Sequence, residues 1–82
     1  MNSEEAFEFV NRLFLERTSA GLSQCQKDIV LGIWKGNTYQ VISDETNWAY
    51  PTVKGTASDL FKKLGKILGI EVNKITFVNT IQ

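Results

Sequence analysis

Apolar residues recur at intervals of three and four along most of the chain, which is the spacing of amphipathic helices. The clearest apolar stripe lies in residues 51–68 and consists of Val53, Ala57, Leu60, Phe61 and Leu64. The same periodicity predicts three shorter helices, at about residues 3–17, 24–35 and 39–46. The pattern therefore predicts an all-α fold of four main helices, followed by a tail that begins at residue 70.

The predicted helices carry signals for where they begin and end. The first two each open with a pair of residues at capping-box spacing, Asn2 with Glu5 and Ser23 with Gln26. Pro51 belongs in the first turn of the last helix, where its missing N–H costs nothing. Gly36 and Gly69 stand where the second and fourth helices are predicted to stop.

The tail at residues 70–82 is open to two interpretations. A small hairpin around Asn73 and Lys74, which would form a wing, suits its β-branched residues. A short fifth helix with Asn73 as its N-cap instead places Phe77, Val78 and Ile81 on one inward face. We favour the helix because of this apolar stripe.

The third and fourth predicted helices have the pattern of a helix-turn-helix. Ile42 is expected to face inward from the short helix, Ser43 to allow close helix approach, and Trp48 to fill the turn. Gly32 and Gly55 fall inside predicted helices, where each glycine costs about 1 kcal/mol relative to alanine. These two glycines therefore indicate close helix packing or the close approach of a partner. The predicted core consists of Phe7, Val10, Phe14, Ile29, Ile33, Ile42, Trp48, Val53, Leu60, Phe61 and Leu64.

Composition limits the classes of protein to which the chain can belong. Its 82 residues, of which 43% are hydrophobic, suffice for one domain with a single core. The chain has no histidine and one cysteine, which excludes an internal disulfide, the common zinc ligand sets and a histidine-based catalytic triad. No apolar run is long enough to cross a membrane, and we expect neither a metal site nor a cofactor. A cytoplasmic location is the default expectation.

No combination of residues points to catalysis. Cys25 has no neighbouring cation to activate its thiol, so we expect it to serve in packing. The acidic pairs Glu4–Glu5 and Asp44–Glu45 are expected on solvent-facing helix surfaces, and the sequence contains no glycine-rich phosphate loop. We therefore expect a non-catalytic protein.

The charges are unevenly distributed, although the net charge is zero. Residues 1–50 carry four basic and seven acidic side chains, a net charge of −3, and residues 51–82 carry five basic and two acidic side chains, a net charge of +3. The positive charge gathers on and after the helix predicted at residues 51–68. The attraction of a phosphate backbone is therefore expected to be local and modest.

The helix at 51–68 occupies the position of a recognition helix, which enters the major groove in DNA-binding helix-turn-helix proteins. The candidate DNA contacts are Thr52, Lys54 and Ser58 for base edges and Lys62, Lys66 and Lys35 for phosphates. The outer face of the helix lacks arginine and asparagine, the best residues for bidentate base readout, and it carries Asp59. We therefore expect weak DNA binding that needs low salt. The alternative is an adaptor domain on which a partner protein docks.

These motifs resemble those of two known families. Residues 22–64 are similar to the LuxR-type helix-turn-helix, through Leu22-Ser23, Gly36, Ile42-Ser43, Thr52–Lys54 and Lys63–Gly65. A closer resemblance, over nearly the whole chain, is to the N-terminal helix-turn-helix domain of von Willebrand factor A–MoxR-associated proteins. This resemblance rests on Gly36–Tyr39, Ile42-Ser43, Ala57–Lys62, Leu68-Gly69, Val72–Lys74 and Phe77.

The closer resemblance implies a place in a larger protein. Domains of this kind head cyanobacterial proteins with NTPase, WD-repeat, TPR or protease-like effector regions, in signalling or conflict systems. By this likeness, residues 1–82 form one N-terminal module, and its partner is DNA or a protein; in the second case the module is an adaptor that regulates an attached NTPase or effector region. Oligomerisation of the parent protein would pair two recognition helices. The chain departs from helix-turn-helix motifs at Val41, Thr46 and Ala49, where a polar residue, a buried leucine and a capping serine are usual.

Overall fold

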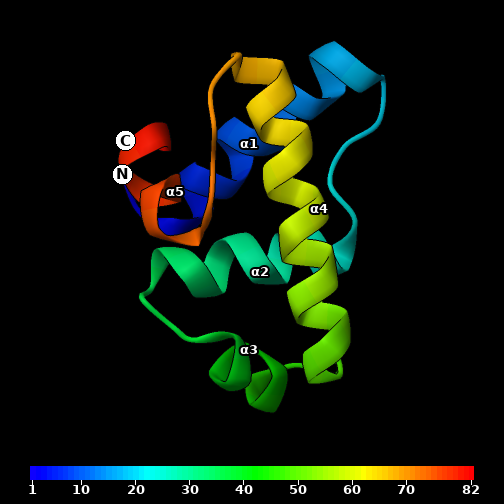
Figure 1. Cartoon of the computed structure of the whole chain (residues 1–82), viewed down its shortest axis with the longest axis vertical. Helices are drawn as coiled ribbons and strands as arrows, with labels where there is room; N and C mark the ends of the chain where they lie inside the picture. The colour runs from blue at the N-terminus through cyan, green and yellow to red at the C-terminus, as the bar shows by residue number, and fades with distance from the viewer.

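The computed structural model describes the whole chain, residues 1–82, and contains five helices and no strand. The helices are α1 (Ser3–Thr18), α2 (Gln24–Trp34), α3 (Tyr39–Glu45), α4 (Tyr50–Leu68) and α5 (Lys74–Ile81) (Figure 1). The predicted all-α fold is therefore confirmed, and the predicted helix bounds are correct to within about one residue. None of the five helices is both long and apolar enough to span a membrane.

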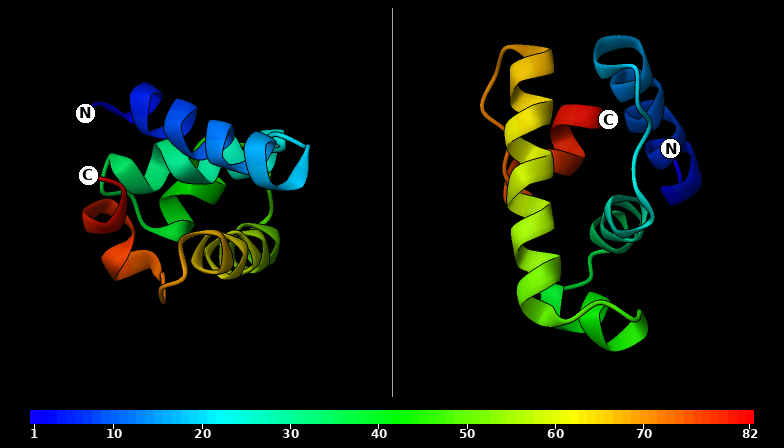
Figure 2. Two further views of the ribbon diagram at one scale, coloured as in Figure 1. Left: turned by 90° about the horizontal axis from the view of Figure 1, so that it is seen from above. Right: turned by 90° about the vertical axis from the view of Figure 1, so that its right-hand side faces the viewer.

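Helix α2 lies at the centre of the fold and contacts each of the other four helices. Seen from above, α1 lies along one side of α2, and α4 lies on the opposite side (Figure 2). The short helix α3 crosses the end of the molecule next to the N-terminal half of α4 (Figure 1). This arrangement leaves one long side of α4 open to solvent.

One hydrophobic cluster holds the five helices together. The predicted core residues are buried, with the exceptions of Phe7 and Trp48, which pack against the cluster but remain partly exposed. Phe7 lies at the edge of α1, where its ring is covered by the Lys27 ammonium group, 4.8 Å from the ring centroid. Trp48 stays near the surface because its indole Nε1–H donates a hydrogen bond to Asp28 Oδ2 at 2.8 Å.

The tail forms the fifth helix, so the hairpin interpretation is wrong. The side chain of Asn73 accepts hydrogen bonds from the backbone N–H groups of Ile75 and Thr76, and Thr76 Oγ1 accepts one from the Asn73 N–H. This reciprocal cap fixes the start of α5 at the point where a hairpin would have turned. Helix α5 then buries Phe77 completely, with its ring centroid 5.4 Å from that of Phe61.

Hydrogen bonds fix the turn between α3 and α4. Ser43 Oγ donates to the Trp48 carbonyl at 2.9 Å, and Thr46 Oγ1 donates to the Ile42 carbonyl at 2.7 Å. Thr46 Oγ1 also accepts a hydrogen bond from the Trp48 N–H at 3.3 Å. Thr46 therefore stabilises the turn through its hydroxyl group at a position where related motifs use the side chain of a leucine.

Candidate nucleic-acid interface

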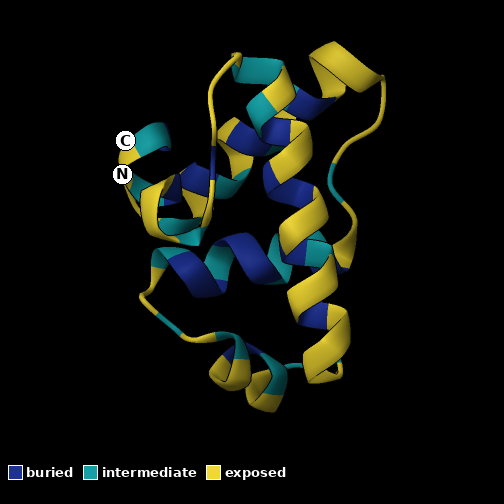
Figure 3. Cartoon of the chain, viewed as in Figure 1, coloured by how far each residue is buried: buried dark blue, intermediate teal, exposed yellow.

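The outer face of α4 is the most extended exposed helix surface in the chain. Its inward face buries Val53, Ala57, Leu60, Phe61 and Leu64, as the apolar stripe predicted. The opposite face is exposed along most of the length of the helix (Figure 3). Five of the six predicted contact residues lie on this helix and are exposed: Thr52, Lys54, Ser58, Lys62 and Lys66.

The charges on α4 leave its outer face positive. The only ion pair in the structure joins Lys63 Nζ to Asp59 Oδ2 at 3.0 Å. Asp59 is the only carboxylate of the helix, and Lys63, one turn away, balances its negative charge. Lys54, Lys62 and Lys66 form no ion pair and remain available to an anionic partner.

The positions around the helix axis separate the predicted contacts. At about 100° per residue, Thr52 and Lys54 are about 160° apart and lie on the two edges of the exposed face. The centre of that face carries Gly55, Asp59, Lys62 and Lys66, at spacings of four, three and four residues. Two of the predicted contacts, Lys62 and Lys66, therefore lie in the central row, which begins with Gly55.

Gly55 has no packing reason to be glycine. A Cβ atom added at Gly55 would meet no atom within 4 Å. At Gly32 in α2, by contrast, an added Cβ would lie 2.5 Å from Ile42 Cγ1, so this glycine permits the close approach of α3. The two helical glycines predicted to serve close packing or a partner therefore differ, and only Gly32 is explained by packing within the chain.

The N-terminal end of α4 has free hydrogen-bond donors. Ala49 occupies the N-cap position and provides no side-chain hydrogen bond, and Pro51 has no N–H group to offer. The backbone hydrogen bonds of α4 begin at Val53, whose N–H donates to the carbonyl oxygen of Ala49 at 3.0 Å. The N–H of Thr52 is therefore left to solvent or to an acceptor from outside the chain.

Lys35 lies apart from the other predicted contacts. It follows the C-terminal end of α2, which is the end of that helix farther from α4 (Figures 1 and 2). Lys35 lines a groove between α2 and α3 together with Asp28 and Glu45. The structure thus brings five of the predicted residues onto one helix and leaves Lys35 near two carboxylates on another surface.

Two tyrosines lie where α3 meets the start of α4. Tyr50 is exposed, whereas Tyr39 is partly buried. Burial raises the pKa of Tyr39 above its usual value of 10.0, and the nearby Tyr50 adds to the effect. Tyr39 therefore keeps its hydroxyl proton throughout the neutral range. The Lys74 ammonium group, 5.1 Å from the ring centroid, ties this side of α3 to α5.

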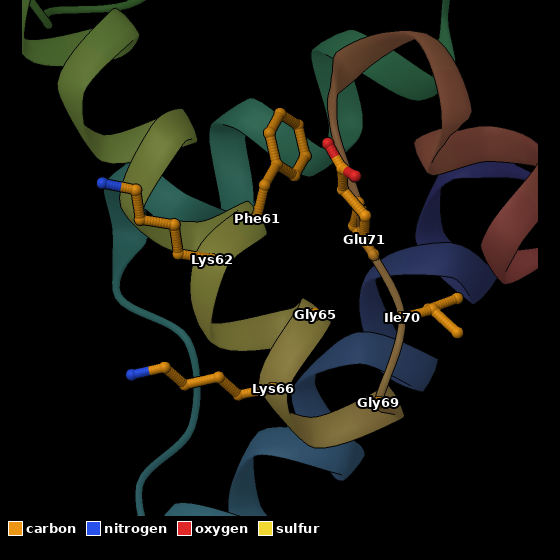
Figure 4. Close-up of a pocket in the computed structure, with 8 residues that line it drawn as sticks. Phe61, Lys62, Gly65, Lys66, Gly69, Ile70 and Glu71 are labelled. Carbon is orange, nitrogen blue, oxygen red and sulfur yellow. The ribbon is translucent and has the colours of Figure 1, made fainter.

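A groove lies beside the C-terminal half of α4, against the connector at residues 69–72 (Figure 4). Its volume is about 520 Å³, and its apolar lining comes from Phe61, Ile70 and Val72. Lys62 and Lys66 border it on the α4 side, with their ammonium groups extending away from the connector, and Glu71 projects from the connector (Figure 4). The groove is therefore mixed in character, with three apolar residues among the eight that line it and opposite charges on its two sides.

The comparison with protein families gives a match over the full chain. A family model described as the vWA-MoxR associated protein N-terminal HTH matches residues 1–82. The comparisons with curated proteins and with solved structures found no match. The matched family is the one that the sequence motifs resemble.

Proposed function

Because the chain belongs to the vWA-MoxR-associated protein N-terminal helix-turn-helix family, we propose that it is a non-catalytic helix-turn-helix module that binds DNA through the outer face of α4. The observation that carries this proposal is the combination of Gly55, in the central row of that face, with three lysines on the same helix that form no ion pair: Lys54 beside it, and Lys62 and Lys66 two and three turns further along. The glycine allows the DNA to approach the helix backbone closely, and the lysines attract its phosphates.

Gly55 supports close contact with a large ligand. A glycine inside a helix costs about 1 kcal/mol relative to alanine, and no neighbour within the chain would be disturbed by a Cβ at this position. A residue that lowers stability without serving the fold is readily explained by a partner that must approach the backbone closely. The floor of a DNA major groove is such a partner, since a recognition helix enters it with its N-terminal residues against the base edges.

The remaining residues divide into positioning and reading roles. Lys62 and Lys66 lie in the C-terminal half of α4, where we expect them to contact phosphates as the helix leaves the groove. The free N–H of Thr52 suits another phosphate oxygen, since the N-terminus of a helix attracts anions. The side chains of Thr52, Lys54 and Ser58 are the candidates for base edges. Because none of these contacts is a bidentate arginine or asparagine pair, we expect most of the affinity to come from phosphates.

Fluorescence anisotropy with short duplexes at low salt tests the proposal. We expect weak binding whose logarithm falls linearly with the logarithm of the salt concentration. Lys62→Ala should weaken binding to all sequences alike and lower the salt slope by about 1, whereas Lys54→Ala should also reduce discrimination between sequences. Lys27→Ala is the matched control, because it removes the same charge from a side chain that lies over the Phe7 ring.

Lys35 provides a second internal comparison. Since it borders a groove that also contains Asp28 and Glu45, we expect Lys35→Ala to affect binding less than Lys62→Ala. Equal binding by the wild-type, Lys62→Ala and Lys54→Ala chains would contradict the assignment of α4. The absence of DNA binding at low salt, even for an artificially dimerised chain, would rule out the proposed function and favour the adaptor alternative.

We also propose a biological setting, which rests on the family. Residues 1–82 would form the N-terminal module of a larger cytoplasmic protein of a bacterial signalling or conflict system. Oligomerisation of that protein would bring two α4 helices to neighbouring half-sites, which compensates for the weak binding of one module. The length of the reading frame beyond Gln82 tests this setting directly, because an attached NTPase or effector region is expected there.

A further inference from the structure

The first turn of α4 has few contacts of its own. Its N-cap residue, Ala49, provides no side-chain hydrogen bond, and residues 49–52 are all exposed. Val53 is the first buried residue of the helix. Thr52 and Lys54, two of the candidates for base edges, belong to this part of α4. Their positions therefore depend on the residues that anchor the start of the helix.

Trp48, which directly precedes this turn, supplies such an anchor. It is the only residue between positions 47 and 52 that is not exposed, and its side chain packs against the hydrophobic cluster. Its carbonyl accepts a hydrogen bond from Ser43 Oγ at 2.9 Å, which ties it to α3. Its indole Nε1–H donates to Asp28 Oδ2 at 2.8 Å, which ties it to α2, the central helix.

The carboxylate of Asp28 is held in the orientation that this contact needs. Gln24 Nε2 donates to Asp28 Oδ1 at 2.9 Å, so each oxygen of the carboxylate has its own donor. Glu45 lines the same groove as Asp28 and Trp48, but its Oε1 accepts from Asn37 Nδ2 at 3.2 Å. Asp28 is therefore the carboxylate that anchors Trp48, and a hydrogen bond to a carboxylate is stronger than one between neutral groups.

We infer that Asp28 is a positioning residue for the outer face of α4. Through Trp48 it sets the place of the first turn of the helix, and with it the direction of Thr52 and Lys54. The effect on α4 stands on the hydrogen bonds alone, whereas its consequence for DNA rests on the proposed function.

The two halves of α4 should respond differently when this anchor is lost. The candidates for phosphates, Lys62 and Lys66, lie in the C-terminal half of the helix, beyond the buried residues Val53 and Leu60. Loss of the anchor should therefore reduce the discrimination between DNA sequences, which we define as the ratio of affinities for the best-bound and worst-bound duplexes of a set. It should leave the salt slope unchanged, because that slope counts phosphate contacts.

A pair of substitutions at Asp28 isolates the hydrogen bond. Asp28→Ala removes the acceptor, whereas Asp28→Asn keeps an oxygen that can accept from Trp48. Both remove the same charge, so a difference between them reports the hydrogen bond and not the attraction of DNA to the net charge. Glu45→Ala is the matched control, because it removes a carboxylate from the same groove without touching Trp48. Trp48→Phe removes the donor and keeps an aromatic ring.

Amide hydrogen exchange of the 82-residue chain, followed by NMR, tests the inference without DNA. The Val53 N–H, which donates to Ala49 O at 3.0 Å, should exchange about fivefold faster in Asp28→Ala than in Asp28→Asn, because the first turn opens locally. Trp48→Phe should show the same increase, and Glu45→Ala should match the wild type. A hydrogen bond that served only overall stability would leave this amide unchanged and would speed only the amides that exchange through global unfolding, such as that of Leu60.

Anisotropy with a set of short duplexes at low salt tests the consequence for binding. Discrimination should be about fivefold lower in Asp28→Ala than in Asp28→Asn, with equal salt slopes. In a Trp48→Phe chain the two substitutions at Asp28 should be equivalent in both measurements, because Asp28 acts through Trp48.

Equal exchange of the Val53 amide in Asp28→Ala and Asp28→Asn would overturn the inference, and so would a difference that persists in the Trp48→Phe chain. Faster exchange with unchanged discrimination would overturn the part that concerns DNA. Faster exchange in a set of chains that bind no DNA at all would support the effect of Asp28 on α4 and overturn the proposed function, so the two failures are distinguishable.

Discussion

The contact between α2 and α3 and the outer face of α4 each contain a glycine inside a helix, but the surroundings of these glycines differ. Gly32 is buried against Ile42, whereas Gly55 is exposed and has open space where a side chain would be. The glycine of α2 is required by a neighbour within the chain. The glycine of α4 has no such neighbour, so its cost to helix stability has to be explained by something outside the chain.

This difference separates residues that serve the fold from residues available for function. Substitutions at the α2–α3 contact should change stability, and any loss of binding should follow from it. Substitutions on the outer face of α4 should change binding while stability stays constant or rises. The two measured quantities, the free energy of unfolding and the affinity for DNA, should therefore respond separately in the two regions.

The largest effect on stability is expected from the inward side of α4. Leu60 is fully buried, so Leu60→Ala should lower the free energy of unfolding by about 2–5 kcal/mol, which is enough to unfold a small domain. Urea denaturation followed by circular dichroism measures this change. Lys62→Ala, two residues away on the outer side, is the control and should change stability by about 0.5 kcal/mol or less. A Leu60→Ala chain that unfolds like the wild type would show that α4 is not packed as described.

A smaller loss of stability is expected at the α2–α3 contact. In Gly32→Ala the new Cβ would lie 2.5 Å from Cγ1 of Ile42, a stiff and buried side chain, so that α3 must shift. Such overpacking costs about 1–3 kcal/mol, and the better helix propensity of alanine returns about 1 kcal/mol of this. The net loss is therefore up to about 2 kcal/mol, and the melting temperature should fall. A higher melting temperature would mean that α2 and α3 do not approach each other this closely.

Local sequence signals predicted most of the fold. The caps at Asn2, Ser23 and Asn73 form as predicted, because a capping box depends only on residues three positions apart. The partial exposure of Trp48 was not predicted. It depends on a hydrogen bond from the indole N–H to Asp28, which lies twenty residues earlier in the chain and is not part of a local sequence signal.

The candidate site was predicted less completely, because helical periodicity gives the face of a residue but not the neighbours of that face. The positions of Thr52, Lys54, Ser58, Lys62 and Lys66 on an exposed helix followed from the apolar stripe of α4. The distance of Lys35 from this helix depends on the direction of α2 in the fold, which the sequence pattern does not contain. Whether any of these residues contacts DNA stays a prediction.

A glycine-to-alanine substitution on the outer face of α4 should change stability in the opposite sense to the same substitution at the α2–α3 contact. Gly55→Ala places a Cβ in open space, so it should raise the free energy of unfolding by up to about 1 kcal/mol. If DNA approaches the backbone at this point, the same substitution should weaken DNA binding even though the protein is more stable. Parallel thermal melts and anisotropy titrations measure both effects. Higher stability with unchanged affinity would place the DNA elsewhere on the surface.

The smallest effect is expected at the ion pair on the outer face. Asp59 and Lys63 are both more than half exposed, so their pair contributes only about 0.3–0.5 kcal/mol to stability. Asp59→Asn should therefore leave the melting temperature almost unchanged. It also removes the only carboxylate of α4 and frees Lys63, so DNA binding should become tighter at low salt and the gain should shrink as salt is added. Glu45→Gln, which removes one negative charge from α3, is the matched control and should have a weaker effect. An equal gain for both variants would indicate that DNA responds to the net charge of the chain and not to the outer face of α4.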